Sequence, residues 1–214
     1  KALSFTGETT TGAAIMRTAS NALKKLSFEL GGKGATVIFD DADLDAAADT
    51  AARAAFRNQG QICLSGSRLI VARSVAEQVV KRVLMRVREI SLGNPLDPKT
   101  TMGSLISKEH RARVLSYIEL ARTKPGIEVL AGGNIPAAFP RGAYLEPTVL
   151  AGVPQDSRLI QEEIFGPVLT VQTFDNPEEA LALANGTPFG LSLSIWTRDL
   201  ARARWEAAAA RFGL

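Results

Sequence analysis

Short apolar runs alternate with helical patterns along most of this sequence, and this alternation limits the possible folds more than any other feature. Strand-like runs at 35–39, 69–72 and 168–174 are separated by segments whose apolar residues recur at helical spacing. Strands and helices that alternate in this way form a parallel sheet covered by helices. We therefore expect an α/β fold with a parallel-rich sheet flanked by helices.

The remaining elements are predicted from the same patterns. Further strands are expected at 2–6, 26–30, 128–130, 144–150 and 191–196. The first of these runs has the pattern of a buried strand. Helices are expected at 9–22, 44–55, 76–87, 114–121, 177–185 and 198–211. Segments rich in glycine, proline or polar residues are expected to be loops, and they lie at 58–67, 93–103 and 131–142.

The charge balance argues against several classes of partner. The chain carries 25 Lys and Arg against 22 Asp and Glu, a net charge of +3, and this mild surplus gives no reason to expect a nucleic-acid or membrane partner. No apolar run approaches the roughly 18 residues of a membrane span, and the first residues lack the layout of a signal peptide. We expect a cytoplasmic protein. The basic side of the helix at 76–87 is interpreted as a solvated face that carries Lys81, Arg82, Arg86 and Arg88.

Cysteine and histidine each occur once in the chain. With Cys63 alone, no internal disulfide and no cysteine-based metal cage can form, and we expect no metal. His110 alone excludes a histidine cluster, and its position before a helix makes a thiol protease a poor interpretation. A lone cysteine is also compatible with a small buried apolar residue.

The two ends of the chain indicate a fragment of a longer protein. The sequence begins without Met, directly before a predicted strand, and it stops at Arg211–Leu214, where a helix would lead into another strand. A mature chain produced by processing is the alternative.

Four segments carry residues suited to chemistry. Cys63 lies in NQGQICLSGSR, where small neighbours would let a substrate and backbone amides approach the sulfur. Glu29 lies in FELGGK, at the end of an apolar run and before two glycines; it could also be a surface residue at the end of a strand. The segment FTGETTTG forms a turn before a helix, and free amides there would suit a phosphate. The fourth segment, QEEIFGPV, runs from two acids into an aromatic residue and a turn, and it could be a plain loop.

Taken in order, these four segments resemble the aldehyde dehydrogenase superfamily. FTGETTTG is similar to its cofactor-side turn, FELGGK to the segment of its catalytic glutamate, NQGQICLSGSR to the segment of its nucleophilic cysteine, and EEIFGPV to its ribose-contacting segment. Glu29 and Cys63 are 34 positions apart, as the family pattern expects. The similarity covers essentially the whole chain, whereas a complete family member is more than twice as long.

This resemblance implies a domain division. Residues 1–33 would be the C-terminal remnant of an NAD(P)-binding domain, namely the last strand–helix–strand piece of a Rossmann-like fold. Residues 34–214 would be a catalytic domain truncated at its C-terminus. The complete protein would form a homodimer or a homotetramer.

The resemblance also implies roles for single residues. Cys63 would be the nucleophile and Glu29 the general base that activates water. Glu163 would bind the ribose on the nicotinamide side, and Phe165 would pack nearby. The family often has Ser at the position of Glu8, and an acid there should repel a phosphate unless it points away or caps the helix. The cofactor, NAD or NADP, would also lie along Thr6, Gly7, Glu8 and Leu30.

The implied reaction is the NAD(P)-dependent oxidation of an aldehyde to a carboxylic acid through a cysteine thiohemiacetal and a thioester. The sequences of two of these segments are similar to those of the hydroxymuconic and aminomuconic semialdehyde dehydrogenases in the family. The small-molecule aldehyde could therefore be a semialdehyde. Two alternatives stay open: a CoA-acylating aldehyde dehydrogenase, against which Glu29 argues, and a fragment that is inactive on its own.

Overall fold

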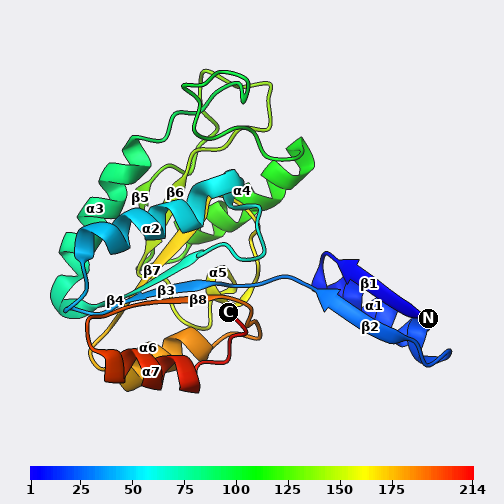
Figure 1. The fold of residues 1–214 in the computed structure, drawn as a ribbon. Helices are drawn as coiled ribbons and strands as arrows, with labels where there is room; N and C mark the ends of the chain where they lie inside the picture. The colour runs from blue at the N-terminus through cyan, green and yellow to red at the C-terminus, as the bar shows by residue number, and fades with distance from the viewer.

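The computed structural model describes residues 1–214 and contains eight strands and seven α-helices (Figure 1). The strands are β1 (Ala2–Thr6), β2 (Lys25–Glu29), β3 (Ala35–Ile38), β4 (Arg68–Ala72), β5 (Glu128–Ala131), β6 (Thr148–Ala151), β7 (Val168–Phe174) and β8 (Leu193–Trp196). The α-helices are α1 (Thr9–Ser20), α2 (Leu44–Phe56), α3 (Ala76–Arg88), α4 (Lys108–Thr123), α5 (Arg158–Gln161), α6 (Pro177–Asn185) and α7 (Leu200–Ala209). Two short 3-10 helices, η1 (Arg57–Gly60) and η2 (Arg73–Val75), complete the chain.

Six strands form one sheet in the order β5-β6-β7-β4-β3-β8. Every neighbouring pair in it is parallel except β5 and β6, which are antiparallel. The expected α/β fold with a parallel-rich sheet flanked by helices is therefore confirmed. Strands β4 and β7 are buried almost along their whole length, as parallel strands covered on both faces are.

The alternation of side chains along β4 assigns the helices to the two faces of the sheet. Leu69 and Val71 pack into one apolar cluster with α2 and α3, whereas Ile70 and Ala72 pack into another with α6. Most buried positions of α2 are alanines, whose small side chains let this helix lie close to the sheet and to α3. A third cluster joins α4 and α5 to β6 and β7.

Polar side chains set the start of several helices. The carboxylate of Asp43 accepts a hydrogen bond from the Ala46 amide at 3.1 Å and so pairs one of the amides that a helix start leaves free. Ser107, Asn176 and Asp199 cap α4, α6 and α7 in the same way. On the basic side of α3, Arg82 and Arg86 form ion pairs with acids of α2, Asp45 and Asp49.

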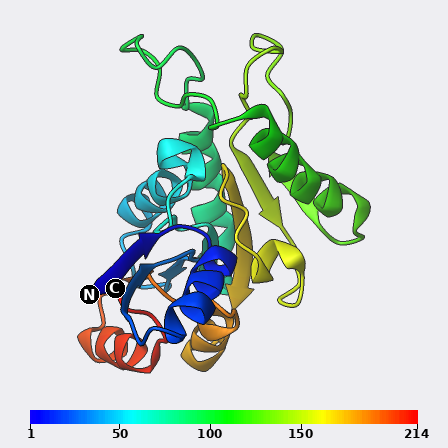
Figure 2. The ribbon, with the colours of Figure 1, turned by 90° about the vertical axis from the view of Figure 1, so that its right-hand side faces the viewer.

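The β1–α1–β2 unit protrudes from the six-stranded body (Figure 1) and faces the viewer in Figure 2. Its two strands are parallel and form a sheet of their own. The expected strand at 2–6 is present, but the expectation that it is buried is wrong, because β1 pairs with one strand only and four of its five residues are exposed. The domain boundary between residues 33 and 34 stays a prediction.

Some element boundaries differ from the expected ones for local reasons. The strand expected at 144–150 begins only at Thr148, because Pro147 has no amide to donate to a neighbouring strand. The strand expected at 191–196 begins at Leu193, since Leu191 has a left-handed backbone with φ 80°. Helix α5 was not expected, and its four residues are too few to show a periodic pattern. None of the helices combines the length and the apolar character that crossing a membrane requires.

Candidate active site

Three segments, 29–34, 58–66 and 162–167, meet beside the six-stranded sheet. A side chain on Gly32 would collide with the carbonyl oxygen of Cys63, and one on Gly31 would collide with the carboxylate of Glu163. The Gly31–Gly32 turn is therefore held directly between the other two segments. Gly32 is required at this turn because a side chain there would collide with the backbone of Cys63.

Cys63 lies in a tight turn that is fixed to the end of α2. The turn is closed by a hydrogen bond from the Ser65 amide to the Ile62 carbonyl at 3.0 Å. The Ser65 hydroxyl donates to the Ala54 carbonyl of α2 at 3.1 Å. The Cys63 side chain is partly exposed, and its backbone amide makes no hydrogen bond within the chain. This amide is free to donate to an oxygen atom bound next to the sulfur.

The backbone before Cys63 adopts an unusual conformation. Asn58 and Gln59 are both left-handed, with φ of 50° and 59°, and they are followed by Gly60 with φ 68°. Consecutive non-glycine residues of this kind carry strain, which is found most often at functional sites. A side chain on Gly60 would collide with the Gly166 carbonyl, so the segment that leads to Cys63 packs tightly on the segment that follows Glu163.

Glu163 is held at the Gly31–Gly32 turn by a hydrogen bond. Its Oε1 atom accepts from the Gly32 amide at 3.1 Å, whereas Oε2 has no partner within the chain. Burial raises the pKa of the Glu163 carboxyl above its usual value, the Gly32 amide and Lys33 oppose this rise, and the nearby Glu8 adds to it. The free Oε2 atom is suited to accept hydrogen bonds from hydroxyl groups of a ligand.

Neighbouring Glu162 anchors this segment from the other side. Its carboxylate accepts hydrogen bonds from Arg158 at 2.6 and 2.9 Å and from the Tyr117 hydroxyl at 2.7 Å. The hydrogen bond from Arg158 holds the pKa of the Glu162 carboxyl below its usual value. Two adjacent acids therefore differ in role, since Glu162 is fully paired by protein groups and Glu163 keeps one oxygen free.

Phe165 presents its ring at the surface of the same segment. The side chain is 39% exposed, and the residue has a left-handed backbone with φ 57°. Nε2 of His110, on α4, lies 2.6 Å from the Phe165 carbonyl oxygen, and the two rings meet edge to face. His110, which the sequence left without a role, thus fixes the conformation of Phe165.

The predicted glutamate lies at the end of β2. The Glu29 carbonyl accepts a hydrogen bond from the Gly7 amide at 3.0 Å, which joins the turn after β1 to the segment that leads to Gly31 and Gly32. Its side chain is exposed and makes no hydrogen bond or ion pair with the chain. The Leu30 side chain packs against Gly12 of α1.

The amides of the turn after β1 are only partly free. The Gly7 amide is used by Glu29, and the Gly12 amide donates to the Glu8 carbonyl. Thr6 is the last residue of β1 and pairs with Glu29 in the register of the two strands. Glu8 occupies the capping position of α1, but its side chain makes no capping hydrogen bond. Its carboxylate therefore does not serve the helix in the way that the sequence left open.

Sequence reasoning missed two buried cations beside this site, Lys33 and Arg68. Both follow glycine- or serine-rich turns and start apolar runs, which is the one signal that the sequence offers. Lys33 is 1% exposed and Arg68 is fully buried. Arg68 Nε donates to the Lys33 carbonyl at 3.0 Å.

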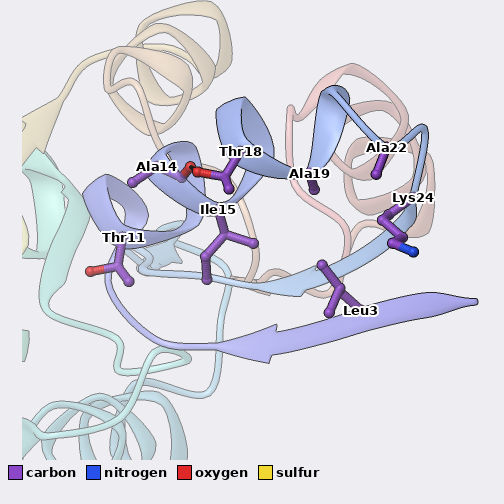
Figure 3. Close-up of a pocket in the computed structure, with 8 residues that line it drawn as sticks. All are labelled: Leu3, Thr11, Ala14, Ile15, Thr18, Ala19, Ala22 and Lys24. Atoms are coloured by element: carbon purple, nitrogen blue, oxygen red, sulfur yellow. Dashed lines mark hydrogen bonds between the residues drawn. The ribbon is translucent and has the colours of Figure 1, made fainter.

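A pocket of about 440 Å³ lies on the β1–α1–β2 unit and does not include the three converging segments in its lining (Figure 3). It is largely apolar, and none of its residues belongs to those segments. Its lining is made by Leu3, Thr11, Ala14, Ile15, Thr18, Ala19, Ala22 and Lys24. The candidate site is placed at Cys63 and Glu163 instead, because the Gly31–Gly32 turn packs against both residues and the Gly32 amide donates to Glu163. No group of three or more His, Cys, Asp or Glu side chains is arranged to hold a metal ion.

The chain matches known proteins along its whole length. The model of the "Aldehyde dehydrogenase family" matches residues 1–214. A 2-aminomuconic 6-semialdehyde dehydrogenase of Pseudomonas sp. is 44% identical over 216 residues, which cover 100% of this chain and 44% of that protein. A betaine aldehyde dehydrogenase of Bacillus subtilis is 42% identical and covers 99% of this chain and 43% of that protein. The chain therefore spans less than half the length of these relatives.

Solved structures agree with these matches. The crystal structure of PnpE in complex with nicotinamide adenine dinucleotide has a TM-score of 0.95 and 48% identity, covering 99% of this chain and 43% of that one; PnpE comes from Pseudomonas sp. WBC-3. The betaine aldehyde dehydrogenase of Staphylococcus aureus in complex with NAD+ has a TM-score of 0.94 and 38% identity, covering 98% of this chain and 42% of that one. On sequence and structure alike, the chain belongs to the aldehyde dehydrogenase family.

Proposed function

We propose that this protein oxidises a small aldehyde to a carboxylic acid with NAD as the electron acceptor, using Cys63 as its nucleophile. The observation that carries the proposal is the meeting of three segments at one place: the Cys63 turn, the Gly31–Gly32 turn that follows Glu29, and the carboxylate of Glu163. The relatives named for semialdehydes and betaine aldehyde support the substrate class. Of these, we favour a semialdehyde.

The first step is the attack of the Cys63 thiolate on the aldehyde carbon. A carbon–sulfur bond forms, and the carbonyl electron pair moves to oxygen. The amide of Cys63 has no partner in the chain and would donate a hydrogen bond to that oxyanion. Preorganised donors of this kind stabilise a developing charge most effectively when they need not first be released from another partner.

The residues around Glu163 fit a dinucleotide. Because Gly31 has no side chain, the Glu163 carboxylate can pack directly against the glycine turn, and its Oε2 atom has no partner in the chain and could accept from ribose hydroxyls. The exposed ring of Phe165 offers a flat apolar surface next to it. When bound, NAD would accept the hydride that leaves the carbon attached to Cys63. We further propose that the cofactor is contacted by Thr6, Gly7, Glu8 and Leu30.

Glu29 is the proposed base for the second half of the reaction. Its exposed carboxylate is in contact with water and has no competing partner in the chain. It would take a proton from a water molecule that attacks the thioester, releasing the carboxylic acid and the Cys63 thiol. General-base assistance of this kind typically contributes about 10²–10⁴-fold to the rate.

The same resemblance supports a proposal about organisation. Residues 1–33 would close an NAD-binding domain of which the β1–α1–β2 unit is the last piece, and residues 34–214 would belong to the catalytic domain. We propose that the complete protein acts as a homodimer or a homotetramer.

The function is tested by following NADH formation with the protein expressed from its complete native reading frame. Betaine aldehyde and 2-aminomuconic 6-semialdehyde serve as the two probes. We expect NADH with at least one of them and, in Cys63→Ala, a loss of about 10⁴-fold or more, as for the removal of a nucleophile that acts with the rest of its site. Ser67→Ala is the matched control, because it also changes a small residue of the same loop. Unchanged NADH formation in Cys63→Ala contradicts the proposal.

A CoA-acylating enzyme is separated from a hydrolytic one by its product. Turnover with and without CoA is followed by chromatography. We expect the free acid in both cases. An acyl-CoA as the product when CoA is present would show that a thiol rather than water resolves the thioester.

A further inference from the structure

Lys33 is buried at the point where the three converging segments meet. Its side chain extends from the glycine turn to the segment of the two acids, where Nζ donates to the Glu162 carbonyl at 2.6 Å. Its own carbonyl accepts from Arg68 Nε at 3.0 Å. The preceding residue, Gly32, donates its amide to Glu163. Residues 32 and 33 thus hold the Glu162–Glu163 segment at two adjacent points.

This lysine is not neutralised by an ion pair. No carboxylate lies within 4 Å of Nζ, and the residue is only 1% exposed. An unpaired ammonium in such a place costs free energy that an apolar side chain of similar length would not cost. Its contact with Glu162 therefore calls for an explanation other than stability.

We propose that Lys33 is a positioning residue that fixes the Glu163 carboxylate in the orientation needed to bind the ribose of NAD. The inference rests on the proposed function. The ammonium acts in two ways: it holds the Glu162 carbonyl, which sets the backbone of Glu163, and its charge favours the ionised form of Glu163. Ionised Glu163 accepts hydrogen bonds more strongly than the neutral acid does.

The charged groups around Lys33 determine how it titrates. Burial, and next the charge of Arg68 on β4, lower the pKa of the Lys33 ammonium to about 7, while Glu163 and Glu162 oppose this. Glu163 in turn is influenced by Arg113 of α4 and by Glu8. Lys33 therefore carries its charge below about pH 7 and loses it above. The affinity for NAD should fall as the pH rises through this range.

The test measures NAD binding by calorimetry, without aldehyde, at about pH 6 and about pH 9. The Cys63→Ala background is used so that the thiol takes no part in the measurement. We expect the protein with Lys33 to bind NAD about tenfold more weakly at the higher pH, the fold-change that corresponds to one hydrogen bond involving a charged group. Lys33→Met should bind NAD about tenfold more weakly than the parent at about pH 6 and about as weakly as the parent at about pH 9, because Lys33 has lost its charge there. Lys99→Met, at an exposed lysine, should behave like the parent at both pH values.

Lys33→Arg keeps the inference falsifiable if Lys33→Met does not fold. Arginine stays charged at both pH values, so its NAD affinity should change less than twofold between them. In turnover, the KM for NAD should rise in Lys33→Met about tenfold while kcat changes about twofold or less, a split that a general loss of folding would not produce.

Two results overturn the inference: a fall in affinity with pH in Lys33→Arg that equals the fall in the parent, or NAD binding by folded Lys33→Met that equals the parent at both pH values. If the parent itself binds no NAD, the proposed function fails. If the parent binds NAD and the variants do not differ from it, only the role of Lys33 fails.

Discussion

Arg68 shows how one residue ties distant parts of this chain together. It is fully buried and forms no ion pair, and its guanidinium donates to three carbonyls: Lys33 at 3.0 Å and, at the end of α6, Leu183 and Ala184 at 2.8 Å each. Burial lowers the pKa of Arg68 to about 10. The rigid fork of arginine suits three fixed acceptors in a way that lysine cannot.

Replacing Arg68 by Met should strongly destabilise the protein. The change leaves the Lys33 and Ala184 carbonyls without a donor, whereas the Leu183 carbonyl keeps the Gly186 amide. Each lost donor costs about 1–3 kcal/mol, so we expect a loss of about 2 kcal/mol or more in the free energy of unfolding. Urea unfolding followed by circular dichroism measures it, with the exposed Arg198→Met as the control. A loss of about 0.5 kcal/mol, as at an ordinary surface site, would show that the three contacts contribute little.

Glu206 on α7 should make stability depend on pH. Its side chain is buried with Oε1 unpaired, and burial, aided by the charge of Glu178, raises the pKa of its carboxyl to about 7. The folded state therefore binds a proton that the unfolded state releases between about pH 4.5 and 7, so this carboxyl lowers stability as the pH rises through that window.

Glu206→Gln tests this pH dependence by thermal unfolding at a series of pH values. We expect a higher Tm than in the parent at about pH 8 and a difference that shrinks toward about pH 4.5. Glu178→Gln, which removes only the neighbouring charge, should give a smaller gain. A Tm difference that stays constant over the whole range would exclude Glu206 as the source.

At the scale of elements, the sequence predicts the bounds of long helices and strands well, and it predicts less well how far each element is buried by its neighbours. Helix α6 and strand β7 occur within the predicted bounds because each has clear local signals: Pro177 at a helix start and an unbroken apolar run at 168–174. Helix α5 could not be predicted because a single turn has no period. The exposure of β1 could not be predicted either, because burial of a strand depends on its neighbours in space.

Glycine turns provide a matched test at this scale. Gly60 and Gly126 both have left-handed backbones, with φ of 68° and 84°, but a side chain at Gly60 would collide with Gly166 whereas the space around Gly126 is open. Gly126→Ala should cost about 1 kcal/mol from conformation alone. Gly60→Ala should move the Cys63 segment and should therefore cost several-fold more free energy of unfolding, which chemical unfolding measures. Equal costs would show that Gly60 does not pack closely on the segment of Glu163.

The whole molecule consists of a six-stranded body and a small protruding unit (Figure 1). The resemblance of four short segments to the aldehyde dehydrogenase superfamily predicted the candidate site residues, because each segment carries its functional side chain within a few positions. It did not predict Lys33 or Arg68, whose significance arises only from burial between segments far apart in sequence. The side chain of Glu29 is exposed in this structure, and its role as the base stays a prediction, as does the role of Cys63 as the nucleophile.

Hydrogen exchange should separate the two parts. Amides of β1 and β2 lie in a two-stranded sheet with exposed strands, whereas β4 and β7 are buried in the centre of the large sheet. We expect the small sheet of the 214-residue chain to exchange by local opening, at least about tenfold faster than β4. Mass spectrometry of peptides measures this difference. Equal protection would mean that the two parts unfold as one unit.

The most direct test of the proposed chemistry is the mass of the Cys63 peptide in Glu29→Gln, after incubation with NAD and an aldehyde that the unsubstituted protein oxidises. Because this variant keeps the nucleophile but lacks the base for hydrolysis, we predict one equivalent of NADH and a peptide heavier by the acyl group of that aldehyde. Undiminished turnover in Glu29→Gln with an unmodified Cys63 peptide would contradict the assignment of these two residues.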